Sequence, residues 1–392
     1  MTDLDFTIKS PDYKSLGLNS NPFPYSGIPD TSPDFYIGQE KAISTINRVI
    51  QTTLISGRSS HIIVTGSYGN GKSHTLKYLQ SKVKENRELS DSNPITAYVS
   101  QPGDSFLEIY RECVYDIGSN LLQKIAQNYI GKICYELSEE GAIEEIIEIN
   151  EGWKAIEEGN VLLSDVIPQA LKRLNNIIKY PDFSRAFLNL AYEENSITSW
   201  EWLCAENIEY SRRRELKLTT NIGNKHVQRA FIALKSVFNE TGYYPFILLI
   251  DEFEYIESLP RKNKYLMLNS IRHLIDTIPN GLVLLIACAP EIWETLISDY
   301  HAFSDRIAHE VNLRPLTRDN VKDLIIAYLN RSREKSFSIN PFTNDGLMAA
   351  YEQGHGNARR IMTICGLAID KALEESKIMI DQDLILSVIE GE

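Results

Sequence analysis

A run of eight residues, Gly66 to Ser73, has the composition and spacing of a loop that binds phosphate groups. Its sequence, GSYGNGKS, fits the pattern GxxxxGK[ST]. Glycines allow successive backbone N–H groups to turn towards the α- and β-phosphates, Lys72 would reach the β- and γ-phosphate oxygens, and the Ser73 hydroxyl would bind Mg²⁺. The sequence therefore predicts ATP and Mg²⁺ as cofactors, with Lys72 facing solvent while the site is empty. The expected nucleotide contacts are Gly66, Ser67, Tyr68, Gly69, Asn70, Gly71, Lys72, Ser73 and His74.

A pair of carboxylates, Asp251 and Glu252, follows a strongly apolar run, FILLI, at residues 246–250. In a parallel sheet the carboxyl ends of the strands face the ligand, so this pair is expected near the phosphate loop. Asp251 would then hold Mg²⁺ together with Ser73, and Glu252 would orient or deprotonate the attacking water. A strand that merely ends in an acidic turn has the same pattern, and it is the pairing with the phosphate loop that favours catalysis.

The elements that must position these residues are short buried strands. Apolar runs rich in β-branched residues at 61–65, 94–100, 246–251 and 282–289 are each of strand length, and helical patterns lie between them. Continuous apolar strands that alternate with helices indicate a parallel sheet covered on both faces. We therefore expect an α/β fold with three layers.

Three segments are expected along the chain. Residues 1–37 contain clustered Pro, Asn, Ser and Asp, which indicates an irregular N-terminal arm. The α/β core is expected at 38–316. Helical patterns near 318–331, 342–352, 357–375 and 381–390 then predict a small all-α domain at 317–392, which we call the lid.

A helical insertion explains the distance between Lys72 and Asp251, which are 179 residues apart. Two strand–helix–strand steps need only about 60 residues, so we expect an insertion at about 101–240, where the pattern is almost entirely helical. Its charge is segregated, because residues 101–170 carry 14 acidic and 4 basic residues whereas 171–245 carry 8 acidic and 11 basic ones. The acidic part could therefore recruit a protein partner.

Composition excludes several classes of protein. The chain has 392 residues, a formal net charge of −13 and an ordinary share of hydrophobic residues, so it is expected to fold rather than stay disordered. Five cysteines without a CxxC pair argue against a disulfide framework and favour the cytoplasm. No apolar run reaches about 18 residues and no secretory signal is visible, so we expect no membrane span.

At this point the chain resembles AAA+ ATPases of the origin-recognition and transposition-regulator branch. The resemblance covers residues 21–100 and 240–390 and includes the motifs NPF and FYIGQE, the latter at 35–40. The stretches SWEWLCAENIEYSRRRELKL and GYYPFILLIDEFEYIESLP are also similar to the ATP-binding proteins of bacteriophage-exclusion (BREX) systems. The resemblance implies an AAA+ core with a lid, and it implies that Ile37 lies in the segment that contacts the adenine.

The resemblance also implies two arginines that act on the triphosphate. Arg306, in AFSDRI, stands where such proteins place the finger that reaches a neighbour's γ-phosphate, although it could equally cap a helix, and Arg314 could serve instead. Arg359, in GHGNARRI, stands where a lid arginine closes over the phosphates, with Arg360 as the alternative. The strand at 282–289 ends in Ala-Cys-Ala, where such proteins usually have a polar sensor residue, and this departure could slow hydrolysis.

Two functions remain open at the level of sequence. The first is an ATPase (ATP and water to ADP and phosphate) that assembles head-to-tail into a ring or filament and acts on duplex DNA as a switch or motor, with other subunits of a phage-defence or transposition system. Its DNA-backbone contacts would come from the basic groups Arg212–Arg214 with Lys217, and Arg261–Lys262 with Lys264. The alternative is a signalling or scaffolding ATPase with slow hydrolysis and no DNA binding, and the basic groups would then be solvated helix faces.

Overall fold

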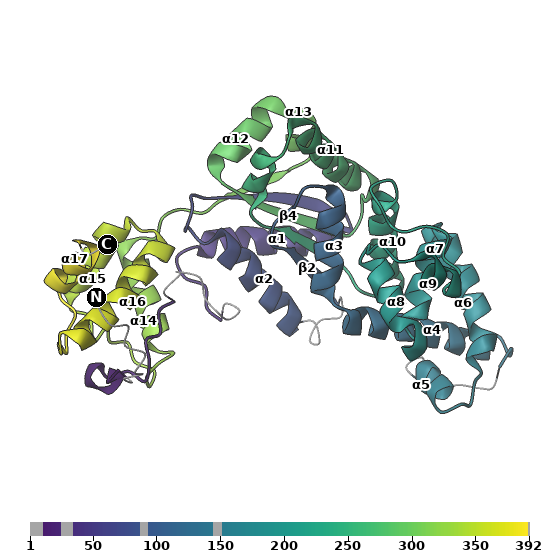
Figure 1. Ribbon diagram of the computed structural model, residues 1–392, viewed down its shortest axis with the longest axis horizontal. Helices are drawn as coiled ribbons and strands as arrows, with labels where there is room; N and C mark the ends of the chain where they lie inside the picture. Colours follow the sequence, from purple (N-terminus) through teal and green to yellow (C-terminus); the bar gives the residue numbers. More distant parts are fainter. Residues whose placement is uncertain (1–10, 25–33, 87–92, 144–150, 391–392) are drawn as a thin grey trace, which may run out of the picture. The chain divides into compact units, whose positions relative to one another are not determined.

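The computed structural model describes residues 11–24, 34–86, 93–143 and 151–390, so parts of the predicted arm lie outside the described residues (Figure 1). The chain forms two compact units. The first unit contains residues 1–44, 66–78 and 312–392, and the second contains 45–65 and 79–311. The phosphate loop is thus grouped with the lid, and the acidic pair with the sheet and the insertion.

A five-stranded sheet forms the centre of the fold, in the order β2-β3-β4-β1-β5. The pairs β1–β4, β3–β4 and β2–β3 are parallel, and their strands are almost wholly buried, which is why the sequence has continuous apolar runs here. The predicted α/β fold is confirmed. The strands are β1 (Ser60–Thr65), β2 (Ile95–Val99), β3 (Phe246–Ile250), β4 (Leu282–Cys288) and β5 (His309–Asn312).

The strand register brings the carboxyl ends of β1, β2 and β3 to one edge of the sheet. Thr65 pairs with Cys288 of β4, and Ile250 pairs with both Val99 of β2 and Ile286 of β4. The phosphate loop leaves β1 at this edge and the acidic pair leaves β3 there. Parallel pairing therefore places the starting points of both motifs on the same side of the sheet.

Helices surround this sheet (Figure 1). Helix α11 packs against α13, and the short 3₁₀ helix that follows the acidic pair, η3, packs against β4. The bounds are α1 (Glu40–Ser56), α2 (Lys72–Asn86), η3 (Phe253–Ser258), α11 (Arg261–Thr277), α12 (Pro290–Asp299) and α13 (His301–Ser304).

Between β2 and β3, the regular elements among the described residues are all helices. Helix α3 packs on β2 and α11, and α10 packs on α3 and α11, so both belong to the layer that covers the sheet. Helices α4 to α8 pack on one another in a separate group, with α6 also against α10 (Figure 1). The bounds are α3 (Phe106–Ile117), α4 (Ser119–Glu139), α5 (Glu151–Glu157), α6 (Leu163–Ile178), α7 (Pro181–Asn189), α8 (Glu193–Leu203), α9 (Tyr210–Glu215) and α10 (Val227–Glu240).

One hydrophobic core runs through the sheet and the insertion. Buried residues from Ile63 of β1 to Leu174 of α6 and Trp202 of α8 belong to the same cluster. Within the insertion, α4 and α5 approach so closely that a Cβ on Gly152 would collide with the backbone carbonyl of Gly131. Continuous packing of this kind joins the insertion rigidly to the second unit.

The lid has the helices that the sequence predicts after residue 317. Three of them begin with side-chain caps, from Thr317, Thr343 and Asn357, each of which accepts a hydrogen bond from a backbone N–H in the first turn. The bounds are α14 (Arg318–Leu329), α15 (Asn344–Gly354), α16 (Ala358–Glu374) and α17 (Gln382–Glu390).

The described part of the arm packs on the lid. A short 3₁₀ helix, η1 (Tyr13–Leu16), begins it, and Leu16, Leu18 and Phe23 are buried in the core of the lid. The Asn21 amide donates hydrogen bonds to the Gly366 carbonyl and to Asp370. The arm is therefore part of the lid's structure, a role that its irregular sequence does not reveal.

Among the described residues, no helix is both long enough and apolar enough to span a membrane.

Candidate nucleotide site

The phosphate loop connects β1 directly to α2, as its motif requires. Gly69 and Gly71 have φ values of +82° and +92°, a conformation that side chains with a Cβ rarely adopt. The Lys72 ammonium donates a hydrogen bond to the Gly66 carbonyl at 2.8 Å, and the residue is only 8% exposed. The expectation that Lys72 faces solvent is therefore wrong, because a charged group at this depth needs a hydrogen-bond acceptor and the loop supplies one.

Contacts within the first unit hold the loop in shape. The Asn70 amide donates to the Leu313 carbonyl at 3.4 Å, and the Thr75 hydroxyl donates to the Gly71 carbonyl at 2.8 Å. Ser73 lies in the first turn of α2 and is half-buried. Ser67 is exposed. The loop is thus fixed from both ends, with backbone groups between them available to a ligand.

The arm segment at 35–37 lies against the first turns of α2. Tyr36 stacks on His74 and Tyr78, with ring centroids 5.9 and 4.9 Å apart, and its hydroxyl is 2.9 Å from the Thr75 hydroxyl. A ring nitrogen of His74 is 3.0 Å from the Phe35 carbonyl. Ile37 follows and is half-buried. His74 is therefore connected to the arm residues that directly precede Ile37.

Burial sets the charge states of His74 and Tyr36. It lowers the pKa of His74, despite the hydrogen bond to the Phe35 carbonyl that opposes the shift, so the imidazole is neutral near pH 7. Burial likewise raises the pKa of Tyr36 to about 12. A neutral aromatic surface of this kind suits an uncharged base better than a phosphate.

The lid contacts the phosphate loop through the start of α16. The Asn357 amide donates to the Tyr68 carbonyl at 2.5 Å, and a Cβ on Gly69 would collide with the same amide. The Arg359 guanidinium lies over the Tyr68 ring, 4.3 Å from its centroid. Of the two arginines that the motif offers, Arg359 is the one against the loop, whereas Arg360 is exposed and supplies a backbone N–H to the Asn357 cap.

The acidic end of β3 holds one buried and one exposed carboxylate. Asp251 is 1% exposed, and its two oxygens accept the Tyr98 hydroxyl at 2.7 Å and the Glu252 backbone N–H at 2.9 Å. Glu252 is exposed and has φ +46°, a left-handed conformation that costs energy in a residue with a Cβ. Strain of this kind is typical of residues whose direction matters for function.

Tyr98 is a residue that sequence reasoning missed. It lies one position before the end of β2, beside the strand that carries Asp251. Burial, with Asp251 nearby, raises the pKa of Tyr98 well above its usual range, so the phenol keeps its proton and donates it to the carboxylate. The signal in the sequence is that Tyr98 stands near the carboxyl end of the expected strand at 94–100, as Asp251 does at the end of the strand at 246–251.

The end of β4 has no hydroxyl or amide side chain. Ala287 and Cys288 are both fully buried there. The departure from the usual polar sensor thus persists in the structure.

Arg306 follows α13 in the second unit. Its guanidinium donates to Asp276 of α11 at 3.1 Å, and both side chains are partly exposed. An exposed ion pair of this kind contributes only about 0–1 kcal/mol, so Arg306 could exchange Asp276 for another anion at little cost.

The two basic groups proposed as DNA contacts contain some residues that form ion pairs and others that are exposed. Arg212 pairs with Glu201 at 2.5 Å, and Lys264 is buried, pairs with Glu257 and lies over the Tyr300 ring. Four other members are exposed and make no ion pair with the residues that the structure describes, namely Arg214, Lys217, Arg261 and Lys262.

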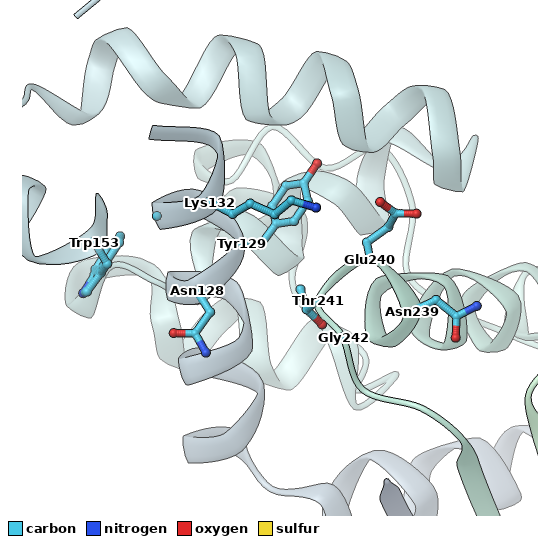
Figure 2. Close-up of a pocket in the computed structure, with 9 residues that line it drawn as sticks. Asn128, Tyr129, Lys132, Trp153, Asn239, Glu240, Thr241 and Gly242 are labelled. Carbon is cyan, nitrogen blue, oxygen red and sulfur yellow. The ribbon is translucent and has the colours of Figure 1, made fainter. Parts of the chain in front are cut away.

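A separate cavity of about 570 Å³ lies in the insertion, between α4, α5 and the end of α10 (Figure 2). Figure 2 shows Asn128 and Asn239 on opposite sides of it, with their amides not directed at a common point. These two amides therefore do not converge on a ligand, and the cavity has none of the loop chemistry of a nucleotide site.

Each of the two motifs carries an oxygen group of the kind that binds Mg²⁺. The ion prefers hard oxygen ligands and usually takes only one or two from the protein, with waters and phosphates as the rest. The Ser73 hydroxyl and the buried Asp251 carboxylate supply groups of that kind. No cluster of three or more His, Cys, Asp or Glu residues that could hold a metal occurs in the described part of the chain, and a nucleotide-bound Mg²⁺ needs none.

Comparison with known proteins assigns the chain to a protein family. The model of the BREX system ATP-binding protein BrxC/D family matches residues 24–335. The chain belongs to this family. No curated protein matches it. The fold is similar to the ORC2 protein of Aeropyrum pernix in its ADPNP–ADP complexes, with 13% identity over 93% of this chain and 70% of that chain and a TM-score of 0.51.

A second solved structure has the same fold. Cdc6p from Pyrobaculum aerophilum is 11% identical over 93% of this chain and 70% of that chain, with a TM-score of 0.50. Family and fold together confirm the resemblance to BREX ATP-binding proteins and to AAA+ ATPases. The BREX family member described here is thus an ATP-binding protein with an AAA+ core.

Proposed function

We propose that the protein hydrolyses ATP, assembles with itself head-to-tail, and acts with duplex DNA as a switch or motor subunit in phage defence. The observation that carries the proposal is the acidic end of β3. Asp251 is buried and held at both oxygens, whereas Glu252 beside it is exposed in a strained conformation. A fixed carboxylate beside a free one is the arrangement that a metal ligand and a water-positioning base require.

In the proposed reaction each group of the chain has one task. Lys72 leaves the Gly66 carbonyl for the β- and γ-phosphates, and backbone N–H groups of the loop bind the remaining oxygens. Mg²⁺, held by Ser73 and Asp251, would neutralise charge on the β- and γ-phosphates. Glu252 orients the attacking water and accepts its proton.

Arg306 supplies the group that completes the site from a second subunit. Its only ion pair with the described residues is a partly exposed one with Asp276, so a neighbour's γ-phosphate could replace Asp276. A site shared in this way requires head-to-tail contacts, which generate a ring or a filament. A cation supplied in trans can raise phosphoryl-transfer rates by about 10³–10⁵.

The DNA contact is assigned to Arg261 and Lys262. Both are exposed at the start of α11, where the helix dipole disfavours cations. Their positive charges therefore do not stabilise the helix but are available to an anionic ligand. Lys264 is excluded from this role because it is buried against Glu257. Phosphate contacts of this type carry affinity without base specificity.

The test combines two single variants. Arg306→Ala has an intact nucleotide loop and Lys72→Ala has an intact Arg306, so a mixture of the two should recover part of the ATPase activity that each lacks alone. Wild-type turnover should also rise faster than linearly with protein concentration. Linear dependence together with no recovery would overturn the shared site.

DNA binding is tested by its salt dependence. The double variant Arg261→Ala/Lys262→Ala should reduce the slope of log affinity against log salt by at most about two units. The matched control is Lys322→Ala/Lys335→Ala, which removes the same charge from exposed positions of the lid and should leave the slope unchanged. Slow turnover without any DNA binding would favour the signalling or scaffolding alternative.

A further inference from the structure

Tyr68 occupies a position of the phosphate loop that its motif leaves unspecified, yet it makes most of the loop's contacts with the lid. Its side chain is 72% exposed, which is unusual for a large aromatic ring. The Arg359 guanidinium covers one face of that ring at 4.3 Å, and Asn357 binds the Tyr68 carbonyl. Backbone and side chain of one residue thus meet two neighbouring residues of α16.

The charge of Arg359 is not neutralised by an acidic group of the described residues. No carboxylate among the residues that the structure describes forms an ion pair with it. A cation over an exposed aromatic ring is held only weakly, whereas a guanidinium binds phosphate oxygens strongly and in two places at once. The ring therefore orients Arg359 without being able to compete with a triphosphate.

The approach of the lid to the loop is also sterically fixed. Gly69 has no Cβ that would collide with the Asn357 amide, and the oxygen of that amide caps α16. The start of α16, and with it Arg359, is consequently held at a set distance from the loop.

We propose that Tyr68 is a positioning residue that holds Arg359 over the phosphate loop before the nucleotide arrives and so favours a nucleoside triphosphate over a diphosphate. The proposal rests on the proposed ATPase function, to which it adds contact of Arg359 with the γ-phosphate, in keeping with the lid arginine that the resemblance implies. Tyr68 itself does not touch the reacting atoms. Its effect is to reduce the freedom that Arg359 must lose when the triphosphate binds.

The test compares the affinities of ATPγS and ADP for three variants of the full chain. Tyr68→Ala should weaken ATPγS binding by about two- to fivefold more than it weakens ADP binding, the range expected for one exposed cation–π contact. Tyr68→Phe keeps the ring and should restore the wild-type preference. Tyr210→Ala removes a tyrosine of similar exposure, 69%, from the insertion and should change neither affinity.

An Arg359→Ala background provides the decisive control. If Tyr68 acts through Arg359, adding Tyr68→Ala to Arg359→Ala should cause no further loss of ATPγS affinity. An equal loss for ADP and ATPγS, a failure of Tyr68→Phe to restore the preference, or an additive double variant would each overturn the proposal. Absent hydrolysis by the wild type would contradict the proposed function instead, because these binding measurements do not require turnover.

Discussion

The phosphate loop with its lid and the helical insertion use polar side chains in opposite ways. In the insertion, several charged groups pair with one another, as Arg173 does with Glu136 and Glu140, and as Arg212 does with Glu201. In the first unit, by contrast, Asn357 and Arg359 of the lid are directed at the loop. Helical regions of similar composition therefore differ in whether their polar groups are already paired or available to a ligand.

Two glycines that allow close contacts show the same contrast between the insertion and the phosphate loop. Gly152 lets the backbones of α4 and α5 touch, and Gly69 lets the loop touch the Asn357 side chain. In the insertion the contact serves packing, whereas in the loop it places a lid residue beside the phosphate site. The same steric property thus supports stability in one region and ligand geometry in the other.

The largest expected difference between the two regions concerns carboxylates. Glu252→Gln should keep ATP binding but lower turnover by about 10²–10⁴, because the variant has lost its general base. Glu139→Gln, an exposed carboxylate of the insertion, should leave turnover unchanged. Steady-state phosphate release and nucleotide binding measure the two effects. Unchanged turnover of Glu252→Gln would show that another group positions the water.

The glycine pair should give opposite results. Gly152→Ala should lower the free energy of unfolding by about 1–3 kcal/mol through overpacking and leave ATP affinity unchanged. Gly69→Ala should weaken ATP binding at least about tenfold, since a Cβ at φ +82° both strains the loop and displaces Asn357. Urea unfolding and nucleotide titration of each variant check the pattern. Equal effects on stability and affinity in both variants would remove the distinction drawn between the regions.

A last expected effect concerns the pH dependence of stability and His61 on β1. Burial lowers its pKa to about 4, with His309 acting in the same direction and Asp276 opposing it. His61 binds a proton near pH 6.5 in the unfolded chain but not in the folded one. The stability that the neutral imidazole contributes to the fold is therefore present above pH 6.5 and is lost as the pH falls towards 4. Between pH 7 and 5 the loss amounts to about 2 kcal/mol. Urea unfolding of His61→Gln at both pH values should show a smaller pH dependence than the wild type.

Much of the fold could be predicted from the sequence because its signals are local. Continuous apolar runs specified four of the five strands, helical periodicity specified the lid, and the glycine-rich motif needed only its own neighbours. The parallel-sheet rule then brought the starting points of the loop and of Asp251 to one edge. These inferences require no knowledge of which distant side chains meet.

The contacts that sequence reasoning missed depend on the three-dimensional arrangement of the chain. The hydrogen bond from Tyr98 to Asp251 depends on the order of strands in the sheet, which the chain sequence alone leaves open. The burial of Lys72 depends on an acceptor in its own loop, and that geometry follows from positive φ values rather than from residue types. Pairing of this kind requires three-dimensional register, so periodicity and motifs do not predict it.

The packing of the arm on the lid has a consequence for synthesis on the ribosome. Asn21 is made near the start of the chain, whereas its acceptor Gly366 is made 345 residues later. At about 5–20 residues per second, the arm waits on the order of 20–70 s for its partner helix. During that interval Leu18 and Phe23 have no lid to cover them, which exposes apolar surface to chaperones or to other nascent chains. Closure of the arm can thus take place only after helix α16 has been synthesised.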